Sequence, residues 1–161
     1  MPKSECSSTK DYSQRLMRSL IRPAVGHCGL RTVRSQTLVQ RTLLDRYAHL
    51  YTLWAYVVMA NHLHILLRPK SHEISLAKIT KCIKGYTARE ANRRLERTGC
   101  KFWQDESFDH RSRNQNEFFR IVDYIENNPV KAGLVKKPEH WIWSSAAERN
   151  RRGWASFRAL T

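Results

Sequence analysis

VVMANHLHILL, residues 57–67, is the stretch of sequence that decides the fold. Its two halves are aliphatic and β-branched, which is typical of β-strands. The Ala60-Asn61 pair between them can form a tight turn, because asparagine tolerates a positive φ. We therefore expect an antiparallel hairpin formed by TLWAYVVM, residues 52–59, and HLHILLRP, residues 62–69.

Two histidines, His62 and His64, stand one residue apart in the second strand. Side chains alternate between the faces of a strand, so both imidazoles point to one face while Leu63 and Ile65 point to the other. A buried imidazole needs a hydrogen-bond partner or a ligand, because an unpaired buried polar group costs about 1–3 kcal/mol. The pair therefore indicates either an ordinary half-exposed strand or two ligands that converge on one divalent ion.

Helical periodicity marks three segments. The first is residues 35–50, with Ser35 as the expected N-cap, and the second is residues 73–99, with Gly99 as the expected stop. The third begins near residue 116 and should end at Asn128, because the residue before a proline disfavours helix. The expected core stripes of the second and third helices are Leu76, Ile79, Ile83 and Tyr86, and Phe118, Ile121, Val122 and Ile125.

Two aromatic segments carry no clear period. KFWQDESFDHR, residues 101–111, is expected to be a loop or short extended piece. Trp141 and Trp143 are expected to anchor the C-terminal part of the chain by packing. Residues 1–34 read as a loosely ordered leader with one short helix near Gln14–Ile21, and residues 148–161 as a basic tail.

The net charge of +15 and a pI near 10.2 predict a polyanionic partner, because such a surplus repels itself in a compact fold. The alternative is a surplus that serves solubility alone. The basic residues on the second helix are either a solvated face or a surface that tracks phosphates. The candidate DNA-binding residues on the second and third helices are Lys78, Lys81, Lys84, Arg89, Arg93 and Arg120.

Arg120, Tyr124 and Asn128 follow an i, i+4, i+8 line on the shoulder of the third helix's apolar stripe. Tyr124 is therefore not an obvious core tyrosine, and it shares its face with an amide oxygen that can bind a metal. Taken singly, Tyr124 is better explained as a ring that packs edge-on with its hydroxyl in water. Taken singly, Asn128 is better explained as a residue that caps the helix end.

Composition excludes several classes of protein. The four cysteines are spread singly, without the paired spacing of a structural zinc site. We see no signal peptide in the sequence, so we do not expect a secreted disulfide framework. No apolar run approaches the roughly 18–20 residues that cross a bilayer. We therefore expect a cytoplasmic protein with no membrane partner.

Three stretches together resemble the REP-associated tyrosine transposases, a branch of the single-tyrosine HUH transposases of bacterial insertion sequences. They are MANHLHILLRP (59–69), FWQDESFDHR (102–111) and YIENNPVKAGLV (124–135), with PEHWIWSSA (138–146) following. The resemblance runs from about Leu38 to Ala147.

The resemblance implies a role for each site residue. His62, His64 and Asn128 would be ligands of a divalent metal, Mg²⁺ or Mn²⁺, and Tyr124 would be the nucleophile. The implied reaction cleaves and rejoins single-stranded DNA at repetitive hairpins (REP-like repeats) through a 5′-phosphotyrosine. The implied protein is a monomer that associates with the bacterial nucleoid. The rival hypothesis is a non-catalytic module, derived from such an enzyme, that binds hairpin DNA or RNA.

The fold that follows is α+β: a ferredoxin-like antiparallel sheet with helices on one face, formed by residues 35–147 as the catalytic domain. Relatives open with a strand that contains an aromatic-His-Val-Thr-like run. Residues 1–34 contain no such run, so we expect that strand to be missing or divergent.

Overall fold

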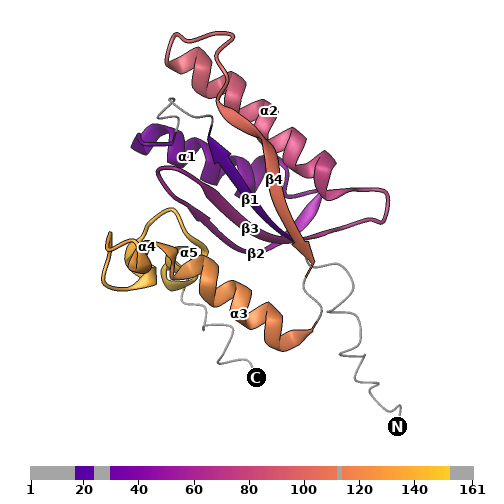
Figure 1. The fold of residues 1–161 in the computed structure, drawn as a ribbon, viewed down its shortest axis with the longest axis vertical. Helices are drawn as coiled ribbons and strands as arrows, with labels where there is room; N and C mark the ends of the chain where they lie inside the picture. The colour runs from indigo at the N-terminus through magenta and orange to yellow at the C-terminus, as the bar shows by residue number, and fades with distance from the viewer. Residues whose placement is uncertain (1–16, 24–29, 112–113, 153–161) are drawn as a thin grey trace.

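The computed structural model describes residues 17–23, 30–111 and 114–152. Its centre is a four-stranded antiparallel sheet with the spatial order β2-β3-β1-β4 (Figure 1). The strands are β1 (Met17–Pro23), β2 (Tyr51–Val58), β3 (Leu63–Pro69) and β4 (Trp103–Arg111). The predicted α+β class with an antiparallel sheet is confirmed.

The hairpin predicted from residues 57–67 is present. Strands β2 and β3 pair from Tyr51 opposite Pro69 to Val58 opposite Leu63. The Met59 N–H donates to the His62 carbonyl at 2.8 Å and closes the turn. The pairing register shifts between Leu53 and Ala55, which is a bulge in the edge strand β2.

The expected leader contains a strand of the sheet, and the expected helix near Gln14–Ile21 is wrong. Met17–Pro23 forms β1, which pairs with β3 on one side and β4 on the other, and Ile21 is buried in the core. The opening strand is therefore present, although its sequence diverges from the family run. A central strand is stabilised by backbone hydrogen bonds to both of its neighbours, and these bonds leave little trace in the side-chain sequence. The segment is also short and contains two arginines, so its sequence did not indicate a strand. The rest of the leader, residues 1–16 and 24–29, lies outside the described residues.

Helices cover both faces of the sheet, not one face as predicted (Figure 1). Helices α1 (Val33–Arg41) and α2 (Leu76–Arg94) pack on the face that carries Leu63, Ile65 and Leu67. Helix α3 (Gln115–Glu126) packs on the opposite face, against Ala55, Val57 and Leu66. The physical reason is visible in β3, where five consecutive residues from Leu63 are buried, so both sides of the strand require a cover.

The helix ends differ from the sequence prediction in two places. Thr32, not Ser35, is the N-cap of α1, and its side chain accepts from the Ser35 N–H at 3.1 Å. Helix α1 continues into a short π-helical segment, η2 (Thr42–Arg46). Helix α2 begins at its cap Ser75 and ends at Arg94, before Gly99. The predicted stripes are confirmed: the side chains of both sets are buried, with Tyr86 half-buried.

Segment 101–111, expected to be a loop or short extended piece, is mostly strand β4, because β1 offers it a pairing edge. The C-terminal part forms α4 (Asn128–Lys131), η3 (Pro138–His140) and α5 (Ser145–Arg151). The anchoring predicted for Trp141 and Trp143 is confirmed: their indole N–H groups donate to the Val58 carbonyl and to Thr37 Oγ1. Residues 153–161 of the expected basic tail lie outside the described part of the chain. No helix in the described part combines the length and apolar character that a membrane span requires.

Candidate functional site

The two histidines share one side of β3, as the alternation of side chains predicts. Their ring centroids lie 4.8 Å apart with an interplanar angle of 76°. His64 is buried and His62 is half-buried just before the strand. Their neighbours Leu63 and Ile65 belong to the core on the other face.

Asn61 contacts the His62 ring and favours one of its tautomers. Its side-chain oxygen Oδ1 lies 2.7 Å from His62 Nδ1. An amide oxygen only accepts, so Nδ1 carries the proton in this contact and Nε2 keeps its lone pair. His62 Nε2 and His64 Nδ1 are both removed from solvent. A neutral imidazole with one bonded N–H is the form in which histidine ligates metals.

Helix α3 brings Tyr124 to the same face. The Tyr124 ring centroid lies 5.4 Å from that of His64, at an interplanar angle of 78°. The helix is fixed there by its buried stripe of Phe118, Ile121 and Val122. Tyr124 itself is 37% exposed, so a substrate can reach its ring.

Asn128 begins the short helix α4, one turn beyond Tyr124. Its Nδ2 donates to the Tyr124 carbonyl at 2.8 Å and more weakly to the Ile125 carbonyl at 3.4 Å. With the amide nitrogen engaged by the helix end, Oδ1 is the side-chain atom that remains for a cation. The helix was expected to end at Asn128, and at this point α3 gives way to the short helix α4. Pro129 lies in the first turn of α4, where a proline is tolerated.

Lys131 is a site residue that the sequence analysis did not single out. Its Nζ lies 4.8 Å from the centroid of the Tyr124 ring, on α4. An ammonium at this distance from an aromatic face makes a cation–π contact. The signal in the sequence is that Lys131 follows Tyr124 by seven residues, which is two helical turns. Pro129 lies between the two and argued against a continuous helix through both.

The structure divides the predicted DNA-binding residues between the two faces of the sheet. Arg120 lies exposed on α3, the helix of Tyr124. The remaining five lie on α2, which covers the opposite face. Two of these five have partners within the protein: Arg93 pairs with Glu90 at 2.8 Å, and Lys84 Nζ donates to the Gln104 carbonyl.

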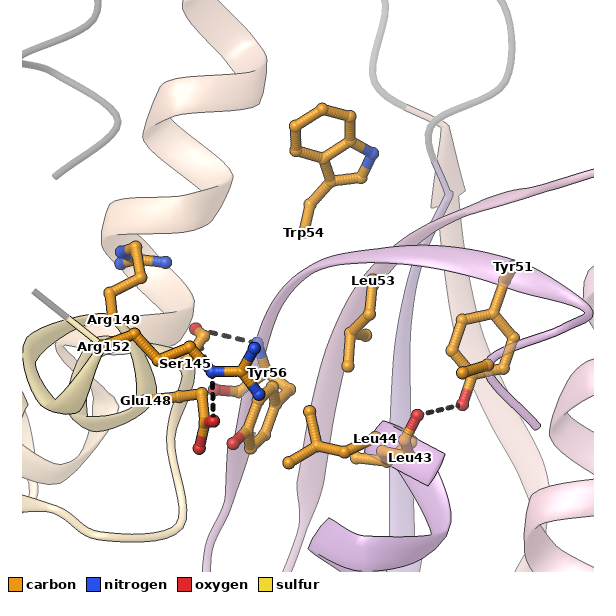
Figure 2. Close-up of a pocket in the computed structure, with 11 residues that line it drawn as sticks. Leu43, Leu44, Tyr51, Leu53, Trp54, Tyr56, Ser145, Glu148, Arg149 and Arg152 are labelled. Carbon is orange, nitrogen blue, oxygen red and sulfur yellow. Dashed lines mark hydrogen bonds and ion pairs between the residues drawn. The ribbon is translucent and has the colours of Figure 1, made fainter. Parts of the chain in front are cut away.

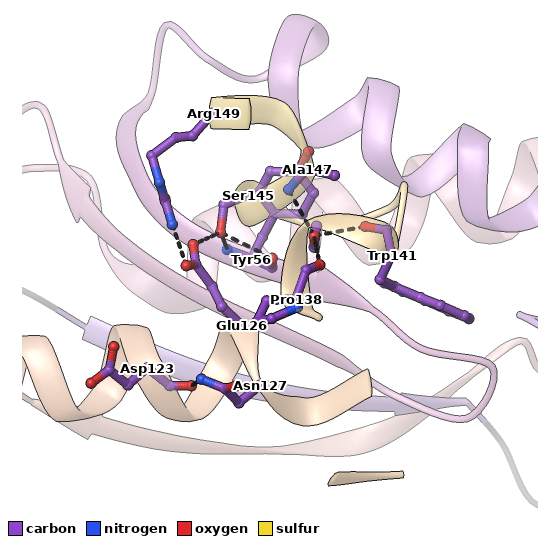
Figure 3. Close-up of polar contacts among 10 residues, drawn as sticks. Tyr56, Asp123, Glu126, Asn127, Pro138, Trp141, Ser145, Ala147 and Arg149 are labelled. Carbon is purple, nitrogen blue, oxygen red and sulfur yellow. Dashed lines mark hydrogen bonds and ion pairs between the residues drawn. The ribbon is translucent and has the colours of Figure 1, made fainter. Parts of the chain in front are cut away.

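A buried ion pair fixes the end of α3 (Figure 3). Glu126, two residues after Tyr124, accepts a hydrogen bond from Ser145 and pairs with Arg149 of α5. Ser145 Oγ also accepts from the Tyr56 N–H at 3.1 Å. The pair therefore ties α3 and α5 to the edge strand β2.

A cavity of about 290 Å³ lies between β2, residues 43–48 and α5 (Figure 2). Its walls are largely apolar, and burial raises the pKa of Tyr51 and raises the pKa of Tyr56 to about 12. The arginine Arg152 at the rim of this cavity is paired with a carboxylate, that of Glu148. This charge balance makes the cavity a poor phosphate site.

Two imidazoles lie together at this site, and the Asn128 amide oxygen on α4 is the candidate third donor for a divalent cation. In the described part of the chain, no three His, Cys, Asp or Glu side chains gather as metal ligands. Two imidazoles and one amide oxygen suit Mn²⁺ and are compatible with Mg²⁺, whose remaining positions water and phosphate oxygens can fill. The buried nitrogens His62 Nε2 and His64 Nδ1 fit that requirement.

Comparison with known proteins gives consistent matches. The family model described as "Transposase IS200 like" matches residues 35–128. The REP-associated tyrosine transposase of Escherichia coli (strain K12) is 29% identical in an alignment of 124 residues that covers 72% of this chain and 71% of that protein.

Two solved structures share the fold. The structure of a REP-associated tyrosine transposase bound to a REP hairpin superposes with a TM-score of 0.71 at 21% identity, covering 93% of this chain and 88% of that one. A putative transposase from Deinococcus radiodurans R1 gives a TM-score of 0.50 at 19% identity, covering 75% of this chain and 96% of that one.

Proposed function

Because the chain belongs to the IS200-like transposase family, we propose that it nicks and rejoins single-stranded DNA at repetitive hairpin sequences. Tyr124 is the nucleophile, and His62, His64 and Asn128 hold a divalent metal, Mg²⁺ or Mn²⁺. The observation that carries the proposal is the chain of ring contacts, 4.8 Å from His62 to His64 and 5.4 Å from His64 to Tyr124. A nucleophile and a metal-ligand pair adjacent to each other are what phosphoryl transfer requires.

The reaction balances with the residues of this chain. The Tyr124 phenol gives its proton to water, and its oxygen forms a bond to the phosphorus. The bond from phosphorus to the 3′ oxygen breaks, its electron pair stays on that oxygen, and the 3′ hydroxyl forms by protonation. The products are a 5′-phosphotyrosine and a free 3′ end, and because one phosphodiester replaces another, the reverse step joins strands without ATP.

The surroundings of Tyr124 serve this chemistry. A bound metal would polarise the scissile phosphate and neutralise charge that develops on it. The phenol is held by its contact with His64, and α3 is held by the Glu126–Arg149 pair. The exposure of Tyr124 lets the strand reach it and lets water take the proton.

The proposed partner is a DNA hairpin of the REP type, since a structural relative is described as bound to a REP hairpin. The net charge of +15 supports a polyanionic partner. We propose Arg120 and the basic residues of α2 as DNA contacts. A chromosomal substrate would bring the protein, as a monomer, to the bacterial nucleoid.

The test is a denaturing gel of the protein incubated with hairpin-bearing single-stranded DNA and Mn²⁺. The parent should form a covalent protein–DNA adduct, and Tyr124→Phe should form none while its hairpin affinity stays within about threefold of the parent. His64→Ala should also lose the adduct. Tyr47→Phe, a half-buried tyrosine of the opposite sheet face, is the matched control and should react like the parent.

A parent that binds the hairpin with a strong salt dependence but forms no adduct would establish the rival hypothesis of a non-catalytic module. A Tyr124→Phe variant that cuts as fast as the parent would show that Tyr124 is not the nucleophile.

A further inference from the structure

Helix α2 carries a second feature suited to DNA, away from Tyr124. A groove of about 570 Å³ lies between α2 and the segment that leads into β4. Figure 1 shows these two elements side by side, with α3 on the other side of the sheet. The groove is lined along α2 by Ala77, Thr80, Lys81, Lys84, Gly85 and Ala88, and across from it by residues 100–103.

No close contact within the described residues requires a glycine at position 85. It lies inside a 19-residue helix, where glycine costs about 0.5–1 kcal/mol relative to alanine. A Cβ built at this position would meet only the Arg89 guanidinium, at 3.9 Å, which is an ordinary contact with a flexible side chain. The fold would therefore accept alanine, and Gly85 lies in the lining of the groove.

The charge of the groove is of one sign. Its described lining contains three lysines and no carboxylate. The hydrogen bond from Lys84 Nζ to the Gln104 carbonyl holds one of them across the groove, while Lys81 is exposed. The cavity beside α5 differs, because carboxylates stand among the basic residues there.

The groove offers no aromatic face on which an unstacked base could lie. Phe102 and Trp103, its two aromatic residues, are each 4% exposed and belong to the core. The Trp103 indole is further fixed by its hydrogen bond to Thr87 Oγ1 at 2.9 Å. Recognition of single-stranded bases normally uses such stacking, whereas a duplex is bound through its phosphates and shape.

We propose that this groove holds the sugar–phosphate backbone of the hairpin stem, with the backbone in close approach to α2 at Gly85 and a phosphate on Lys81. The inference rests on the proposed DNA substrate but not on the role of Tyr124. It separates the basic residues of α2 into two groups. Lys81 and Lys84 line the groove, whereas Lys78 and Arg93 lie outside its lining.

Substitution of Gly85 tests the proposal with two effects of opposite sign. Gly85→Ala should raise the melting temperature by about 2–4 °C, through its higher helix propensity. Gly85→Gln should weaken binding of a fluorescent hairpin about tenfold in anisotropy titrations, because its side chain fills the groove. Both are measured in the Tyr124→Phe background, so that cleavage does not interfere. Gly85→Gln binding that equals the parent's would overturn the proposal.

Lysine variants test the charge. Lys81→Gln should weaken binding and lower the slope of log affinity against log salt by about 1. Lys70→Gln, an exposed lysine after β3 that lies outside the lining and outside the proposed DNA contacts, is the matched control, and an equal effect of the two variants would overturn the proposal. Exchanging base pairs within the stem should leave the ratio of parent to Lys81→Gln affinity unchanged, and a ratio that follows the sequence would refute backbone binding.

Thiol protection gives an independent measurement. Cys100 lines the groove, while Cys82 lies on α2 outside its lining. Bound hairpin should slow alkylation of Cys100 several-fold and leave alkylation of Cys82 unchanged, as measured by peptide mass spectrometry. Equal rates at Cys100 with and without DNA would overturn the proposal.

A parent that binds no hairpin would overturn both the groove and the proposed function. A parent that binds and forms adducts, with groove variants equal to it, would overturn the groove alone.

Discussion

Removal of the Glu126 carboxylate should destabilise the protein far more than removal of Glu90, although Glu90 makes more ion pairs. Glu126 and Arg149 are 10% and 12% exposed, and Ser145 also donates to Glu126. Glu90 pairs with Arg93 and Arg94, which are 71% and 48% exposed. Breaking a buried pair leaves an uncompensated charge inside the protein, whereas surface pairs contribute little.

The expected size of the effect follows from that burial. Glu126→Ala should lower the free energy of unfolding by about 3–5 kcal/mol. With a urea dependence of about 2 kcal/mol per molar, the urea midpoint should fall by about 1.5–2.5 M. Glu90→Ala should shift the midpoint only slightly, because its partners are solvated.

Urea unfolding followed by circular dichroism and tryptophan fluorescence measures both variants. The slope of the transition should stay constant, since a changed slope would indicate a different unfolded state. Arg149→Ala added to Glu126→Ala should cost much less than either change alone, because the charge pair is already broken. If Glu126→Ala moved the midpoint no further than Glu90→Ala, the burial argument would be refuted.

Three further outcomes are expected. Burial raises the pKa of Tyr56 to about 12, whereas a tyrosine in the unfolded chain has a pKa of roughly 10. The neutral Tyr56 hydroxyl therefore contributes fully to the free energy of unfolding below pH 10, and this contribution is lost as the pH rises to 12. Urea unfolding between pH 9 and 12 should show this loss, about 2–3 kcal/mol, and an identical pH profile for Tyr56→Phe would contradict it. Lys131→Gln should slow adduct formation about ten- to a hundredfold in single-turnover assays, with Lys136→Gln as the control, because it removes a cation beside Tyr124; an unchanged rate would exclude Lys131 from the reaction. Chelation of divalent metal should abolish the adduct and leave hairpin affinity within about threefold, and a persistent adduct would exclude a metal requirement.

The local elements of the fold were readable from the sequence because short-range patterns specify them. The 57–67 hairpin, the buried stripes of α2 and α3, and the shared side of His62 and His64 follow from periods of 2 and 3.6 residues. The family resemblance added what no period supplies, namely that Tyr124 belongs with the histidines.

Contacts between distant segments were not readable, and there the prediction failed or was silent. Strand β1 was missed because its pairing partners are far along the chain, and for the same reason β4 was expected only as a loop or short extended piece. The cover on both sheet faces was missed although five buried residues in β3 require it.

By itself, the sequence determined which residues could do chemistry and on which side of their own strand or helix they lie, because those properties depend on neighbours a few residues away. Only the tertiary structure decided that α3 presents Tyr124 to His64, that α2 lies on the opposite face, and that Gly85 opens a groove between α2 and residues 100–103. These arrangements arise because each apolar stripe must be buried against whichever sheet face remains uncovered, and that choice is made by the whole chain at once.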